Sequence, residues 1–390
     1  MEKIGRRWTS ERKRLAPLLL SMLTITGFGF WVAPGLPTAA TTPAAGGGPV
    51  EIAPAFEPVA GTVDLGPLPA DTSLTLVVGL ASSDPAGLEL AAAGRGHLAA
   101  NTVSSLFGAP QGQVDAASAY FASFGLLVRP SPDHLLLLVQ RPASGVAQAF
   151  HTSFEQYASG GRQFYSHTSV ATLPGGLPWT GAVGLGTQHG PRPQVASSFA
   201  GRGNIPLGSC TLSFGLTPCD FENAYNSSGL LGLGTNGTGF TIGVVDTYDS
   251  NETQNSLAGD LARFAQNYSL PVGTVHFLYP VPTTKNLNRT QTGWGVEEAL
   301  DLEWSRGAAP GATLDMTFAP DAFAGLYAAV DWLVAHQAVN VISLSWGEPD
   351  VGVYNAFQAA CQFACNATSD GSYSLLHPVL AAAAAEGIGV

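Results

Sequence analysis

The hydrophobic pattern of the chain has two parts that differ in character. Between residues 67 and 187, short apolar runs such as SLTLVVGL (73–80) and HLLLLVQ (134–140) alternate with amphipathic stretches such as QVDAASAYFASFG (113–125). Runs of the first kind predict strands, and apolar residues spaced three and four apart predict helices. The order reads βααββαβ, which predicts an α+β domain with helices against a sheet.

From residue 216 onwards, apolar strand-like runs alternate regularly with helical segments. GFTIGVVDTYD (239–249), ATLDMTF (312–318) and VNVISLSWG (339–347) are predicted strands. This alternation predicts an α/β fold with a doubly wound parallel sheet, whose ligands bind at the carboxyl ends of the strands. The final GIGV (387–390) predicts the first residues of a further strand, so we expect the sheet within this sequence to be incomplete.

The first 40 residues have a different composition. A basic stretch, KIGRRWTSERKR, precedes a long apolar run that ends in small residues near Ala39 and Ala40. This order predicts a cleaved secretory signal and an extracellular protein. A membrane anchor is the alternative, because the apolar residues from Leu15 to Ala33 are nearly enough to span a bilayer. Pro17 and the glycines of the run favour cleavage.

Two stretches are rich in Pro and Gly, and their apolar residues follow neither the spacing of a strand nor that of a helix. Residues 41–66 are predicted to be a linker, and residues 188–215 a second linker that carries the maturation site. The domains they separate would span residues 67–187 and 216–390.

The net charge of the chain limits the classes of molecule that it can bind. The chain of 390 residues has 16 Lys and Arg, 28 Asp and Glu, and a net charge of −12. Six of the basic residues lie before residue 15, so the remainder has little with which to bind phosphates. Nucleic acid is therefore excluded as a partner. A scarcity of cations also limits self-repulsion in acid, although an acidic protein that works at neutral pH would have a similar composition.

The four cysteines form two close pairs, Cys210 with Cys219 and Cys361 with Cys365. In an exported protein the simplest prediction is one disulfide within each pair. A zinc site is the alternative, but no histidine lies within ten residues of any cysteine. We therefore predict no metal site at the cysteines.

Carboxylates concentrate in one short segment, GWGVEEALDLEW (293–304), although only 11% of all residues are charged. Glu297 and Asp301 are four residues apart, which places them on one face of a helix. Like charges at this spacing repel, but a pair that shares one proton provides a base and an acid. The alternative is a solvated helix face with ordinary acids.

The segment GVEEALDLEWSRGAAPGATLDMTFAP (295–320) resembles the catalytic helix of the sedolisins. These are serine-carboxyl peptidases, with a subtilisin-like fold and a Ser-Glu-Asp triad. The resemblance places Glu297 at the triad glutamate, the general base, and Asp301 at the triad aspartate. Glu298 is the less favoured candidate for the base.

Further segments carry the same resemblance. LTPCDFENAYN (216–226) is similar to the start of the mature enzymes, and residues 67–187 resemble the pro-kumamolisin activation domain. Asp246 would support the triad through a hydrogen-bond network. Three consecutive residues would border the substrate cleft: Ser345, Trp346 and Gly347.

The resemblance implies a precursor with a subtilisin-like doubly wound sheet in residues 216–390 and a ferredoxin-like activation prodomain in residues 67–187. It further implies a secreted, monomeric endopeptidase that acts in acid on polypeptides, with its own propeptide as an intramolecular partner. No membrane partner is expected once the signal is cleaved. It also implies Ca²⁺, with ligands expected beyond residue 390.

The sequence departs from the family at the nucleophile. The family's Gly-Thr-Ser motif is absent from these 390 residues, and so is its oxyanion-hole aspartate. We therefore expect this chain alone to be inactive. Two alternatives stay open. One is a short inhibitor or binding module without catalysis; the other is a classical subtilisin-like protease with Asp246 as its aspartate, although no His-Gly-Thr-His motif follows.

Overall fold

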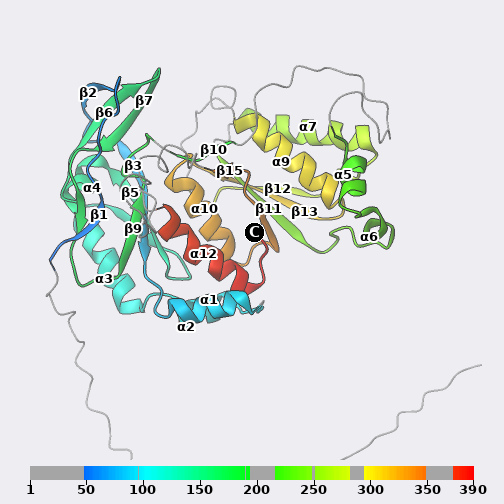
Figure 1. The fold of residues 1–390 in the computed structure, drawn as a ribbon, viewed down its shortest axis with the longest axis horizontal. Helices are drawn as coiled ribbons and strands as arrows, with labels where there is room; N and C mark the ends of the chain where they lie inside the picture. Colours follow the sequence, from blue (N-terminus) through cyan, green and yellow to red (C-terminus); the bar gives the residue numbers. More distant parts are fainter. Residues whose placement is uncertain are drawn as a thin grey trace, which may run out of the picture. The chain divides into compact units, whose positions relative to one another are not determined.

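The computed structural model describes the chain in seven ranges between residues 48 and 390 (Figure 1). They are residues 48–94, 96–188, 190–193, 216–247, 251–281, 294–347 and 372–390. The predicted signal, residues 1–40, lies outside them. No helix in these ranges has both the length and the apolar character that a membrane crossing requires.

A four-stranded antiparallel sheet, in the order β4-β5-β3-β9, organises the first half. Its strands are β3 (Ser73–Leu80), β4 (Leu127–Pro130), β5 (Leu136–Pro142) and β9 (Trp179–Val183). Three helices connect β3 to β4, and one follows β5: α1 (Pro85–Ala93), α2 (Ala100–Phe107), α3 (Gln111–Ala122) and α4 (Ala143–Ala149). This is the βαββαβ order of a ferredoxin-like unit, and it agrees with the predicted α+β domain.

Both faces of β3 are covered, which explains its nearly continuous apolar sequence. Leu76 and Val78 pack with Phe121 of α3 in one hydrophobic cluster. Val77 points to the opposite face, because side chains alternate along a strand, and packs in a cluster that includes Val330 of the second half. The two halves therefore share a hydrophobic core.

Two further small sheets complete the first half. In the first, β1 (Val50–Ala53) pairs with β8 (Ala171–Leu173). The second has the order β2-β6-β7, with strands β2 (Val63–Pro67), β6 (Phe154–Ser159) and β7 (Arg162–His167). Residues 41–66, predicted to be a linker, therefore contain β1 and most of β2. Both strands pair with segments about a hundred residues later, so the local sequence contains no sign of the pairing.

A four-stranded parallel sheet, in the order β12-β13-β11-β14, organises the second half. Its strands are β11 (Thr241–Thr247), β12 (Val275–Leu278), β13 (Thr313–Ala319) and β14 (Val341–Ser343). Four helices alternate with them: α7 (Asn251–Tyr268), α9 (Trp294–Ala308), α10 (Ala324–Ala335) and α12 (Ser372–Glu386). After α12, Gly389 forms a parallel bridge to Val341. The predicted alternation and the parallel sheet are confirmed.

Helices cover both faces of this sheet, as a doubly wound arrangement requires. On one face Val244 packs with Leu257 of α7 and Leu302 of α9. On the other, Val245 lies in the cluster that contains residues of α10 and α12. Figure 1 shows α7 and α9 on one side of the strands and α10 and α12 on the other.

Short elements flank the parallel sheet. α5 (Pro218–Ala224) begins with a capping box between Thr217 and Asp220, and α6 (Ser228–Gly232) follows it. β10 (Arg192–Pro193) pairs antiparallel with β15 (Trp346–Gly347). Cys219 is in a disulfide. The other three cysteines lie outside the described residues, so the predicted pairings stay predictions.

Arg306 fixes the C-terminal end of α9. Its side chain is fully buried, and it donates hydrogen bonds to the carbonyl oxygens of Pro310 at 3.0 Å, Ala312 at 2.6 Å and Thr274 at 3.1 Å. These acceptors lie just before β12 and β13. One cation therefore joins the acid-bearing helix to the strands beside it.

Replacing Arg306 by Met should destabilise the chain by about 2–4 kcal/mol, because buried carbonyl oxygens would lose their donors. The free energy of unfolding, measured by urea titration, tests this. Arg263→Met is the control, because Arg263 is exposed on α7, and it should change stability by less than about 0.5 kcal/mol. Equal effects of the two substitutions would contradict the role given to Arg306.

Candidate active site

Four carboxyl groups are buried together where β11 and the first turns of α9 meet. The relative exposures are 2% for Glu297, 0% for Glu298, 7% for Asp301 and 0% for Asp246. Asp246 is the penultimate residue of β11, so the group lies at the carboxyl ends of the parallel strands. The alternative of a solvated acidic helix face is wrong for these residues.

Asp246 is the most constrained member of the group. Neither carboxyl oxygen has a hydrogen-bond partner. Burial raises the pKa of Asp246 well above its ordinary value, and the nearby charges of Asp301, Glu298 and Glu297 raise it further. The surroundings thus favour a protonated Asp246.

Asp301 lies on α9, beside Ser345. Burial raises the pKa of Asp301 to about 7, a hydrogen bond from the Ser345 hydroxyl opposes this, and the charge of Glu297 adds to it. Its Oδ2 atom has no hydrogen-bond partner. A carboxyl group that titrates near neutrality between other acids is suited to holding and sharing a proton.

The Ser345–Gly347 segment is tied to the same strand end. The indole N–H of Trp346 donates to the carbonyl oxygen of Val245 at 2.8 Å. Its ring packs edge-on against Tyr327, with centroids 6.0 Å apart. The structure therefore brings Ser345 and Trp346 to the acids, while the backbone of Gly347 pairs with Arg192 of β10.

Glu303, the remaining acid of the segment, has different neighbours. Burial raises its pKa to about 7, and the charge of Asp260 on α7 raises it further. The acids of α9 therefore lie in two different places. Glu297, Glu298 and Asp301 lie near Asp246, whereas Glu303 lies toward α7.

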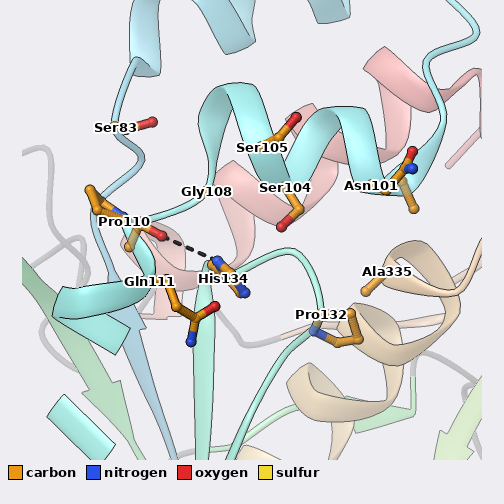
Figure 2. Close-up of a pocket in the computed structure, with 12 residues that line it drawn as sticks. Ser83, Asn101, Ser104, Ser105, Gly108, Pro110, Gln111, Pro132, His134 and Ala335 are labelled. Atoms are coloured by element: carbon orange, nitrogen blue, oxygen red, sulfur yellow. Dashed lines mark hydrogen bonds between the residues drawn. The ribbon is translucent and has the colours of Figure 1, made fainter. Parts of the chain in front are cut away.

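A large cavity lies elsewhere and lacks the chemistry of the acid cluster. It has a volume of about 790 Å³, and Ser104, Asn101 and Gln111 contribute polar groups to its lining. Figure 2 shows His134 among them, with its ring nitrogen 3.2 Å from the Ala109 carbonyl oxygen. No carboxylate lines this cavity, so it is not the candidate site.

No set of three potential ligands for a metal ion occurs among the described residues. The Ca²⁺ implied by the resemblance would have ligands outside this sequence, and it stays a prediction.

Residues 60–178 match the family model of the pro-kumamolisin activation domain. The chain carries such an activation domain. The match supports a sedolisin-type precursor, the class that the motifs around Glu297 resemble. It begins just before β2 and includes all of β2, β3, β4 and β5, so its start lies before the predicted boundary at residue 67. No curated protein matches the chain.

Replacing Asp301 by Asn should make the stability of the chain less dependent on pH. The folded-state pKa of about 7 lies above the ordinary value of 3.8. The protonated group therefore contributes stability that is complete below the ordinary pKa and is lost as pH rises through about 7. Relative to wild type, the variant should gain about 2–4 kcal/mol between pH 4 and pH 8.

Urea titrations at several pH values measure this gain. Asp115→Asn is the control, since Asp115 is exposed on α3, and it should follow the wild-type curve. A wild-type stability that rises from pH 4 to pH 8, or the same slope in wild type and Asp301→Asn, would contradict a raised pKa at Asp301.

Proposed function

We propose that residues 216–390 belong to a subtilisin-like catalytic domain of a serine-carboxyl peptidase. Glu297 is its general base and Asp301 is the residue that orients the base. The observation that carries the proposal is the burial of both side chains beside Asp246, at the strand ends where Ser345 and Trp346 also lie. The activation domain in the same chain supports a peptidase precursor.

In the proposed reaction, the carboxylate of Glu297 accepts the proton of a serine hydroxyl as the oxygen attacks a peptide carbonyl. Asp301 holds Glu297 in place and shares its proton. Asp246, in its protonated form, limits the negative charge of the cluster. The family's nucleophile motif does not occur in these 390 residues, so we expect this chain alone not to hydrolyse peptides.

We further propose that the linker after the activation domain blocks the substrate edge. Extended peptides bind enzymes by adding a strand to an exposed edge. Here β10 already pairs antiparallel with β15, the strand that contains Trp346 and Gly347. Cleavage after β10, within residues 194–215, would let a polypeptide substrate take this place.

Secretion, a monomeric state and Ca²⁺ binding beyond residue 390 belong to the same proposal. Secretion is supported by the basic and apolar pattern of residues 1–40. Endopeptidase activity in acid is supported by the carboxyl chemistry of the cluster, which needs proton sharing.

The test uses the protein encoded by the full open reading frame that contains codon 390. Expressed whole, it should hydrolyse a denatured protein substrate in acid after maturation. Glu297→Gln should lower kcat by about 10²–10⁴-fold with little effect on KM, because a base acts in the transition state.

Glu303→Gln is the matched control. It removes a carboxylate from the same helix, but one that lies toward α7, and it should leave kcat within about threefold of wild type. A stop codon directly after residue 390 would contradict the peptidase proposal and favour an inhibitor or binding module. Undiminished hydrolysis by Glu297→Gln would refute the assignment of the base.

A further inference from the structure

Sequons for N-linked glycosylation, Asn-x-Ser or Asn-x-Thr, are frequent in the second half of the chain. They contain six of the 13 asparagines, although Ser and Thr are only 60 of the 390 residues. At that frequency, chance would place about two of 13 asparagines in a sequon. None lies in residues 60–178, which match the activation domain. The six begin at Asn226, Asn236, Asn251, Asn267, Asn288 and Asn366.

The sequons in the part of the chain that the structure describes lie in turns and at the ends of a helix. Asn226 lies between α5 and α6, and Asn236 lies in the turn before β11. Asn251 begins α7, and Asn267 is its penultimate residue. Such positions are reached more easily by a modifying enzyme than the interior of a strand or helix. The last two sequons lie outside the described residues.

At Asn226 the turn explains the asparagine but not the hydroxyl that follows it. Asn226 is exposed and has a left-handed backbone, with a φ of 53°. Asparagine adopts this conformation more readily than most other residues with a side chain. α6 begins at Ser228 without a side-chain cap, so the helix does not require this hydroxyl at its start. A hydroxyl two residues after the asparagine is what a sequon requires.

At Asn236 the side-chain amide is fixed by its oxygen, and its nitrogen is unused. Oδ1 accepts hydrogen bonds from the backbone N–H of Thr238 at 3.1 Å and from the Thr238 hydroxyl at 2.7 Å. Within the described residues, Nδ2 of Asn236 donates no hydrogen bond. A glycan is attached at this nitrogen, so the turn keeps both hydrogen bonds after modification.

The segment around these two asparagines exposes large apolar side chains and lacks charges. Residues 223–245 contain no Asp, Glu, Lys, Arg or His. Contiguous apolar surface without charged residues favours association between molecules. Four side chains within four positions of Asn226 or Asn236 are exposed: Tyr225 (72%), Leu230 (54%), Leu233 (83%) and Phe240 (57%).

A glycan has the chemistry to cover such a surface. The C–H face of a sugar ring packs on aromatic and aliphatic side chains, while the hydroxyls stay hydrated and solubilise the protein. Tyr225 directly precedes Asn226, and its ring packs on Phe221 with centroids 4.6 Å apart. Most of the Tyr225 side chain stays open to solvent beside the asparagine.

We propose that Asn226 and Asn236 carry N-linked glycans that cover the apolar surface of residues 225–240. In the transfer, Nδ2 of the asparagine forms a bond to the anomeric carbon of a sugar. The bond from that carbon to a lipid diphosphate breaks, the diphosphate leaves with the electron pair, and the amide loses one proton. The secretory membrane supplies the lipid-linked sugar and the transferase. The inference rests on the proposed secretion but not on the proposed catalysis.

Glycans at these positions leave the candidate active site accessible. Asn236 precedes β11, so it lies at the amino ends of the parallel strands, whereas the buried acids lie at their carboxyl ends. Pro218 of α5 lies against Gly307 near the end of α9, far along the helix from the acids of its first turns. Figure 1 shows α6 at the periphery of the second half.

Glycopeptide mass spectrometry of the protein from its source cells and their medium tests the modification. Most molecules should carry sugar masses on Asn226 and on Asn236. Asn101 and Asn340, which are not in sequons, are the controls and should be unmodified. Secreted protein with both sequon asparagines unmodified would overturn this inference and leave the proposed secretion standing. Protein retained in the cells would contradict the proposed secretion, and this inference with it.

The covering role is tested by the double variant Asn226→Gln/Asn236→Gln, secreted by the same cells. Its binding of a hydrophobic dye should rise at least about twofold over that of wild type, because the apolar surface is uncovered. Asn223→Gln, which changes an exposed asparagine outside any sequon, should behave as wild type. Enzymatic removal of the glycans from folded wild type gives the same comparison if the double variant is not secreted. Unchanged dye binding after loss of the glycans would refute the cover.

Discussion

Burying acids without cations is the constraint on which the second half of this protein depends. Isolated carboxylates are strongly disfavoured in apolar surroundings, so their pKa rises and they stay protonated. Asp246, Glu297, Glu298 and Asp301 meet where the strands end, and the fold keeps them there through apolar packing. Leu302 of α9 is packed on the sheet, and Arg306 anchors the far end of the helix to carbonyl oxygens, not to the acids.

The regular part of the fold could be predicted because its signals are local. β3 and β11 are apolar runs, and the helices between the parallel strands have clear periods. β1 and β2 could not be predicted, because each is short and pairs with a strand distant in the sequence. The hydrophobic pattern does not predict α2 either, because this helix buries only Val103 and Phe107.

The candidate site was predictable to the extent that spacing determines it. A separation of four residues puts Glu297 and Asp301 on one helix face, and the end of a buried strand puts Asp246 at the sheet edge. Spacing could not show that Glu303 lies toward α7 instead, since only the packing of the helices decides this.

The central claim is that the cluster around Asp246 keeps protons at a pH where ordinary carboxyls have lost them. Infrared difference spectroscopy of the folded chain detects the C=O stretch of a protonated carboxyl directly. The account predicts that this band persists well above pH 4 and that Asp246→Asn removes part of it, because burial and three neighbouring acids raise the pKa of Asp246. Complete loss of the band near pH 4, as for exposed carboxyls with a pKa of about 4, would contradict it.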